Sequence, residues 1–191
     1  MLAFCDLDCY LRYHYKKEYV GLFAVYTKTS DTIWIPRDFY RSDYKSNAVT
    51  ITPLIIIGEN CMVPLHYNIL IADHKTRMVT CFEPVDRSRF RPVDRLLKRA
   101  SRDQGYRYCC DYYYGPQYRE MQQLGYPTTN CGYWILAYLD NSGNCRGGCH
   151  QYIVDYKAKI KEWLHDNCVY VKRDFYKTVE ERKPLSYYVY T

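Results

Sequence analysis

Three apolar runs between residues 48 and 86 constrain this sequence more than any other stretch. Val49–Ile57 is rich in β-branched residues, and Leu65–Ala72 and Met78–Phe82 flank the turn-like segment Asp73–Thr76. Short apolar runs that end at turn-forming residues are typical of buried strands rather than of helices. The stretch therefore predicts three strands, the last two of which form a hairpin.

The hairpin brings two chemically useful residues together. A turn centred on the His74–Lys75 peptide would place Leu70 opposite Val79 and His66 opposite Glu83. Facing residues on neighbouring strands have Cβ atoms about 5 Å apart. His-Lys is a poor two-residue turn, but a symmetric four-residue loop would keep this pairing. The sequence thus predicts an imidazole beside a carboxylate on adjacent strands.

A cysteine lies at the start of a predicted buried helix. Tyr126–Asn130 contains helix breakers and caps, and the apolar segment Cys131–Leu139 follows it. The positive end of a helix dipole favours a thiolate. A cysteine at a helix start is more often a small buried hydrophobe than a nucleophile. Cys131 becomes a candidate nucleophile only in combination with His66 as its base and Glu83 as the acid that orients the base.

The chain carries a second acid that could orient the histidine, Asp111. It lies within the aromatic run Arg107–Tyr114, which predicts a strand. Asp111 is most simply a carboxylate in a loop or at a strand edge, and the hairpin register favours Glu83.

These motifs resemble the adenain family, the maturation proteases of adenoviruses. That group also contains SUMO-specific proteases and the capsid-maturation proteases of large DNA viruses and virophages. The similarity rests on His66-Tyr67, Phe82-Glu83-Pro84, Cys131-Gly132 before a helix, and the tyrosine-ended run Tyr19–Tyr26. It covers about residues 19–140. The histidine is usually followed by tryptophan in this family, so Tyr67 must supply the aromatic ring here.

The resemblance implies an α+β fold with a central mixed or antiparallel sheet flanked by helices. The nucleophile would lie at the N-terminus of a buried central helix. The length suits a single domain over residues 1–191, with a core at about 19–140 and a C-terminal helix and tail at 141–191.

The resemblance also implies a cysteine endopeptidase with a Cys–His–Glu triad. Such an enzyme would cleave capsid or scaffold precursors after small or glycine residues during virion assembly, inside the virion and at the host-cell assembly site. Deconjugation of ubiquitin-like proteins is the alternative within the group. The family's oxyanion glutamine lies six or seven residues before the cysteine, whereas Gln123 and Gln122 lie farther from Cys131. Gln123 is the preferred donor, and Gln122 stays open.

The net charge of +6 has a local source in Asp86–Asp103, which holds seven cations and three aspartates. A solvated helix face would explain this segment, and so would contact with a polyanion such as nucleic acid. The resemblance supports the second explanation, because DNA or a short peptide activates adenain. A non-catalytic basic virion protein that binds nucleic acid is the competing function. The candidate contacts are Arg87, Arg89, Arg91, Arg95, Lys98, Arg99 and Arg102.

The ten cysteines and the hydropathy suggest a compartment. The longest uncharged apolar run, Val49–Gly58, is too short to cross a bilayer, and no secretory signal is visible. We therefore expect a soluble intracellular or virion-packaged protein, a monomer with mostly reduced thiols and no required cofactor. Two mixed zinc sites are less favoured than free thiols; their ligands would be Cys5, Cys9 and His14, or Cys145, Cys149, His150 and Cys168.

The remaining segments give a coarse map of the fold. Amphipathic patterns predict helices within residues 1–18 and 152–166. Two strands are expected in 19–35, a loop or short helix in 37–47, a partial helical stripe in 86–103 and a short helical turn at 118–123. Further strands or an arm are expected at 169–171 and 187–190.

Overall fold

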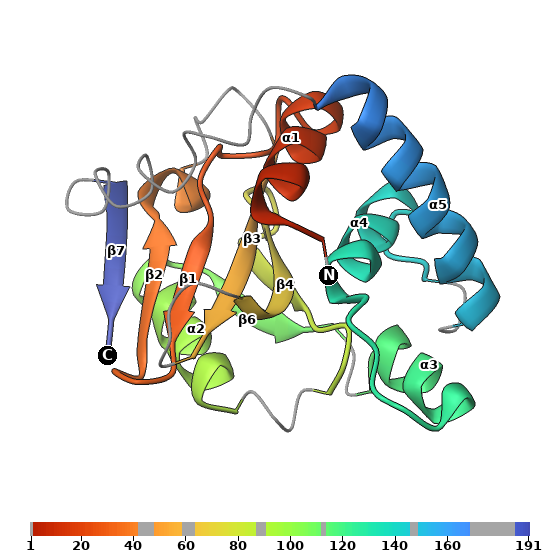
Figure 1. The fold of residues 1–191 in the computed structure, drawn as a ribbon. Coiled ribbons are helices and arrows are strands. Elements are labelled where there is room, and N and C mark those ends of the chain that lie inside the picture. Colours follow the sequence, from red (N-terminus) through yellow and green to blue (C-terminus); the bar gives the residue numbers. More distant parts are fainter. Residues whose placement is uncertain are drawn as a thin grey trace.

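The computed structural model describes residues 2–41, 48–58, 64–86, 91–111, 114–145, 149–168 and 186–191. Within these residues, seven strands form one mixed sheet in the order β6-β5-β4-β3-β1-β2-β7 (Figure 1). They are β1 (Ala24–Thr27), β2 (Thr32–Pro36), β3 (Val49–Ile57), β4 (Pro64–Asp73), β5 (Met78–Phe82), β6 (Arg107–Cys110) and β7 (Tyr187–Tyr190). β1 and β3 are parallel, as are β5 and β6, and the other neighbouring pairs are antiparallel. The α+β class with a mixed sheet is confirmed.

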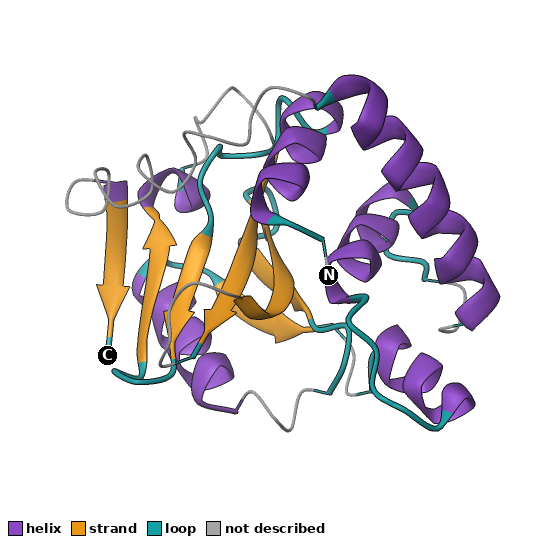
Figure 2. Ribbon diagram, in the orientation of Figure 1, coloured by secondary structure: helices purple, strands orange, loops and turns teal. Residues whose placement is uncertain are grey.

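Helices cover both faces of this sheet (Figure 2). They are α1 (Phe4–His14), the 3-10 helix η1 (Arg37–Tyr40), α2 (Arg91–Asp103), α3 (Pro116–Leu124), α4 (Cys131–Asp140) and α5 (His150–Asn167). One core lies between the sheet and α1, α4 and α5, and a second lies between the sheet and α2 with η1. No helix in the described part of the chain is long and apolar enough to span a bilayer.

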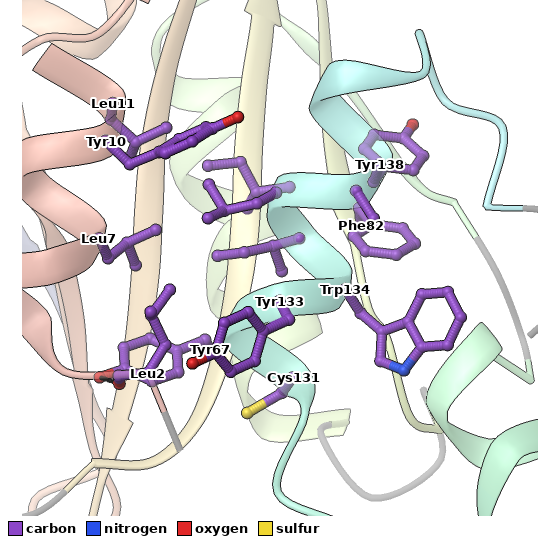
Figure 3. Packing of buried hydrophobic residues seen from close by; sticks show 14 of the residues in the cluster. Leu2, Leu7, Tyr10, Leu11, Tyr67, Phe82, Cys131, Tyr133, Trp134 and Tyr138 are labelled. Atoms are coloured by element: carbon purple, nitrogen blue, oxygen red, sulfur yellow. Dashed lines mark hydrogen bonds between the residues drawn. The ribbon is translucent and has the colours of Figure 1, made fainter. Parts of the chain in front are cut away.

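The cysteine-bearing helix α4 is enclosed by the rest of the fold. Eight of its ten residues, from Cys131 to Tyr138, are buried. A helix that is apolar all round its circumference must be covered on all sides. α4 packs against β4 on one side and α5 on another, and Phe82 stacks on Tyr138 at a ring separation of 4.0 Å (Figure 3). This packing makes α4 a rigid element and fixes the position of Cys131 at its start.

The β4–β5 hairpin forms as predicted, but its register is shifted by two residues. Ala72, rather than Leu70, lies opposite Val79, and Ile69 lies opposite Phe82. A two-residue shift keeps every side chain on its face of the sheet, whereas a one-residue shift would not. His66 and Glu83 are consequently diagonal neighbours instead of directly facing residues.

The turn chemistry explains this shift. The Asp73 carboxylate accepts hydrogen bonds from the backbone N–H groups of Lys75 and Thr76, at 2.9 and 3.0 Å. Arg77 takes a left-handed conformation with φ of 54°. An aspartate that caps its own turn stabilises a four-residue loop over His74–Arg77. The loop is therefore centred one residue later than the sequence suggested.

Most other predicted elements are present, with adjusted ends. α1, α5, β1, β2 and β7 lie where the patterns placed them. The predicted turn at 118–123 is the longer helix α3, because Pro116 in its first turn supplies the fixed φ of a helix start. The strand predicted at 107–114 ends at Cys110. The strand predicted at 169–171 lies outside the described residues.

Two cysteines considered as zinc ligands are instead bonded to each other. A disulfide joins Cys9 on α1 to Cys168 just after α5. Cys9 and Cys168 belong to different alternative zinc sites. The bond removes one candidate ligand from each site and ties α1 to the end of α5.

Reducing the Cys9–Cys168 bond should lower the free energy of unfolding by about 2–4 kcal/mol. The two cysteines are 159 residues apart in the sequence, and a cross-link over a long loop restricts the unfolded chain strongly. Thermal melting with and without dithiothreitol measures the effect. The Cys9→Ser variant should melt at one temperature under both conditions. A shift of equal size in that variant would show that another bond is responsible.

Candidate active site

Cys131 is the first residue of α4 and lies at its positive end. The first helical hydrogen bond runs from Trp134 N–H to the carbonyl of Asn130, at 2.9 Å. Cys131 is only 2% exposed, and it lies beside Leu2 and Tyr67 at the base of the helix (Figure 3). The ring of Tyr67 is fully buried, and its hydroxyl donates to the Leu2 carbonyl. The thiol therefore lies in a closely packed environment.

His66 and Glu83 are hydrogen-bonded despite their diagonal register. The His66 ring donates from Nε2 to Glu83 Oε1 at 2.7 Å, and the backbone N–H of Val85 donates to the same oxygen at 2.7 Å. The β3–β4 register shifts between Ile56 and Ile57, which makes an irregularity next to His66. Such bulges redirect nearby side chains. Both partners are buried, so the pair is screened little by solvent.

The surroundings of His66 favour its protonated form. Burial of the ring lowers the pKa of His66, but the negative charge of Glu83 and hydrogen bonds to Cys131 and Glu83 outweigh it. Together they raise the pKa of His66 to about 10. Because Nε2 is engaged with Glu83, Nδ1 is the ring nitrogen left for the sulfur. The structure thus brings Cys131, His66 and Glu83 into one chain of contacts.

The second acid, Asp111, is engaged elsewhere. Its carboxylate accepts a hydrogen bond from the hydroxyl of Tyr138, near the far end of α4. Its backbone N–H bonds the carbonyl of Cys81 at 2.8 Å and extends the pairing of β5 and β6. Asp111 therefore supports the helix, and Glu83 is the acid that contacts His66.

Gln122 and Gln123 both lie on the exposed side of α3. Gln123 accepts a hydrogen bond from the backbone N–H of His150 through Oε1, at 3.2 Å. This contact directs its side chain toward the start of α5. The assignment of Gln123 to the oxyanion stays a prediction.

A third glutamine, Gln117, was missed in the sequence. It is 3% exposed, its backbone N–H donates to the carbonyl of Pro84, and its Nε2 donates to the carbonyl of Thr128, both at 2.8 Å. Gln117 therefore connects the Glu83 turn to the segment before Cys131. Gln117 lies too far before Cys131 in the sequence for its contact with the segment before the cysteine to be predicted. Pro116 was the available signal, because it marks the first turn of α3.

The start of α3 also touches the Glu83 turn through its backbone. Gly115 N–H donates to the carbonyl of Val85 at 2.8 Å. A Cβ on Gly115 would lie 2.3 Å from the carbonyl carbon and oxygen of Pro84. Only glycine permits this approach, which fixes α3 against the turn that carries the acid.

The candidate polyanion contacts lie away from the cysteine helix, on α2. Arg87 and Arg89 fall outside the described residues. The exposed cations of α2 include Arg91, Arg95, Lys98, Arg99 and Arg102. All but the first of these line an open hollow with Tyr106, Arg107 and Tyr108. Three of them have partners. Arg95 bonds Asp31 and Arg99 bonds the Thr191 carbonyl, both at 3.0 Å, and Arg102 forms an exposed ion pair with Asp103 at 3.6 Å. The opposite face of α2 is buried, so the helix is amphipathic.

The fold and the site together define an α+β protein in which a buried thiol, an imidazole and a carboxylate lie next to one another in space, in that order. No protein-family model matches the chain, and no curated protein matches it significantly. The likeness to adenain therefore remains a resemblance of motifs.

Proposed function

We propose that this chain is a cysteine endopeptidase with Cys131 as nucleophile, His66 as acid–base catalyst and Glu83 as orienting acid. The observation that carries the proposal is the position of His66, which is hydrogen-bonded to Glu83 at 2.7 Å and close enough to Cys131, at a helix start, for that group to raise the pKa of the ring. The three groups come from β4, the turn after β5 and α4, which are separate rigid elements. A histidine with a purely structural role would not need a carboxylate on one side and a thiol at a helix start on the other.

In this mechanism the Cys131 thiolate attacks the scissile carbonyl carbon while His66 is an imidazolium. His66 then gives its proton to the leaving amine, and the acyl group stays on sulfur as a thioester. Water, deprotonated by the neutral imidazole, attacks the thioester; the C–S bond breaks and the acid product leaves, which restores the Cys131 thiolate beside the His66 imidazolium. The backbone N–H of Cys131 and one glutamine amide would stabilise the oxyanion. One such donor contributes about 3 kcal/mol to lowering the barrier.

The substrate class rests on the resemblance to adenain. We propose a viral maturation protease that cleaves capsid or scaffold precursors after small or glycine residues at the site of virion assembly. The burial of Cys131 and His66, at 2% and 6% exposed, supports a narrow approach to the sulfur. Such an approach excludes bulky side chains next to the scissile bond. The same narrowness suits the diglycine ends of ubiquitin-like proteins, so deconjugation is the alternative substrate within this reaction class.

An electrophilic peptide that ends in glycine tests the enzyme directly. We expect it to modify Cys131 alone, identified by mass spectrometry of the digested protein. The reaction should be run with and without DNA, because the family can require an activator. If circular dichroism shows that the protein is folded, and Cys131 stays unmodified both with and without DNA, the result would argue against a protease.

The hollow beside α2 favours a second function, binding of a polyanion. Its lining combines five cationic side chains with the rings of Tyr106 and Tyr108. Cations neutralise phosphates, and a tyrosine ring can stack on a base. Tyr106 is only 4% exposed, so the partly exposed Tyr108 is the ring available for stacking. This surface would serve a protease that is activated by nucleic acid, or a basic virion protein without catalysis.

Replacing Lys98 and Arg102 together by glutamine should weaken DNA binding and reduce its salt dependence. Each phosphate that the variant no longer neutralises should change the slope of log K against log salt by about 0.9. Fluorescence anisotropy with a labelled duplex at several salt concentrations gives this slope. Lys159 and Lys161, exposed on α5, supply a control pair whose replacement by glutamine should leave the slope unchanged. Equal effects of both pairs would indicate general charge attraction instead of a site.

A further inference from the structure

A buried carboxylate on α3, Glu120, has no role in the mechanism above. Glu120 is fully buried. Taking a charged carboxylate out of water is costly unless hydrogen bonds compensate it. Its four partners are the Asn130 amide at 2.7 Å and His150 Nδ1 at 3.1 Å on Oε1, with the Trp134 indole N–H at 2.9 Å and the Thr128 hydroxyl at 3.2 Å on Oε2.

Three of these partners flank the proposed nucleophile. Thr128 and Asn130 precede Cys131, and Trp134 lies one helical turn after it. Figure 3 shows Trp134 projecting from the first turn of α4 on the side opposite Leu2 and Tyr133. One carboxylate thus joins the approach to α4 with its first turn.

The segment that leads into Cys131 is held by other side chains as well. Gln117 Nε2 donates to the Thr128 carbonyl at 2.8 Å, and Lys157 Nζ donates to Asn130 Oδ1 at 3.3 Å. The Asn130 side chain is therefore held from both ends, by Glu120 on α3 and Lys157 on α5. Asn130 also carries the peptide bond whose N–H belongs to Cys131. Its orientation sets the direction of both the sulfur and that N–H group.

We propose that Glu120 is a positioning residue for Cys131, acting through Asn130 to fix the geometry in which the sulfur and the Cys131 N–H meet the scissile carbonyl. This inference rests on the proposed protease function. A misplacement of about 1 Å in such a group can lower the rate about 10²-fold. Glu120 itself touches none of the reacting atoms.

The Glu120→Gln variant separates positioning from simple packing. Glutamine keeps the volume but offers one acceptor oxygen and one amide. The Trp134 indole can only donate, so the glutamine oxygen should remain with Trp134 and Thr128. The amide would then face Asn130 and His150, and the bond to Asn130 would be broken. We expect kcat for hydrolysis of a glycine-ended peptide to fall about 10-fold to 100-fold with KM within about 3-fold.

A thermodynamic cycle tests the route through Asn130. If Glu120 acts through Asn130, the double variant with Asn130→Ala should lose no more kcat than the greater of the two single losses. Alkylation of Cys131 by iodoacetamide, which needs little orientation, should change less than about 3-fold in Glu120→Gln. Glu162→Gln makes the same chemical change on the exposed face of α5 and should change none of these quantities.

The outcomes separate this proposal from the protease itself. If the wild-type protein neither hydrolyses peptides nor reacts at Cys131, the proposed function fails. If the wild type is active and folded Glu120→Gln keeps its kcat, or the two losses add, the positioning role is wrong. Should Glu120→Gln fail to fold, Asn130→Ala alone decides, because an unchanged kcat in that variant also rejects the proposal.

Discussion

Replacing Cys131 by alanine should reduce peptide hydrolysis about 10⁴-fold or more, to a rate near background. The reaction proceeds through a thioester, and alanine offers no atom that can form one. The stability should change little, since the side chain loses a single sulfur atom at the helix start. Steady-state hydrolysis of a glycine-ended peptide, together with thermal melting, measures both effects.

Cys145 provides a matched control for this experiment. It is also buried, at 3% exposed, and free. Burial and the nearby charge of Asp111 raise the pKa of Cys145 to about 12, so it stays a thiol near neutral pH. Cys145→Ala should retain full activity and labelling. Hydrolysis that persists in Cys131→Ala, or an equal loss in Cys145→Ala, would mean that the nucleophile is wrongly assigned.

The second large effect is expected from Glu83→Gln, which should lower kcat about 10²-fold to 10⁴-fold. The glutamine amide of this variant can stabilise the wrong tautomer of His66. Because the amide is neutral, it also no longer balances the positive charge of the protonated His66 ring. Because Glu83 raises the pKa of His66, the variant should show a His66 pKa well below 10. Titration of the imidazole by nuclear magnetic resonance measures this change directly.

The raised pKa of His66 also makes the stability of the folded protein depend on pH. The pKa of His66 is about 10 in the folded protein and 6.5 for a free histidine. Protonated His66 therefore contributes stability that is complete below pH 6.5 and is lost as the pH rises through about 10. In Glu83→Gln this loss should move to lower pH. Asp111→Asn, which changes an acid that contacts Tyr138 instead, should leave the His66 titration unmoved. A His66 pKa that is equal in Glu83→Gln and wild type would exclude Glu83 as its partner.

The apolar runs and the turn residues were sufficient to predict the elements that carry the candidate site. β4, β5 and α4 follow from local patterns, and so does the position of Cys131 at a helix start. The exact hairpin register did not follow, because it depends on how Asp73 caps the turn and on the left-handed conformation of Arg77. The prediction that His66 meets Glu83 survived the error because the shift was an even number of residues.

The supporting contacts could not be predicted from local patterns. Gln117, Glu120 and Cys168 acquire their roles from partners on α1, α4, α5 and the turn after β5, which only tertiary packing brings close. A glutamine and a glutamate in one short helix such as α3 would both be predicted to lie on the surface. Their burial depends on where the neighbouring helices lie, which no periodicity in these short segments reports.

The disulfide also determines what happens to this protein when its backbone is cut. Cys9 and Cys168 enclose His66, Glu83 and Cys131 in one covalent ring. A single protease nick anywhere between the two cysteines opens the ring but releases no fragment, and both halves remain attached. On a gel, such a nicked chain would migrate at full mass until a reductant is added.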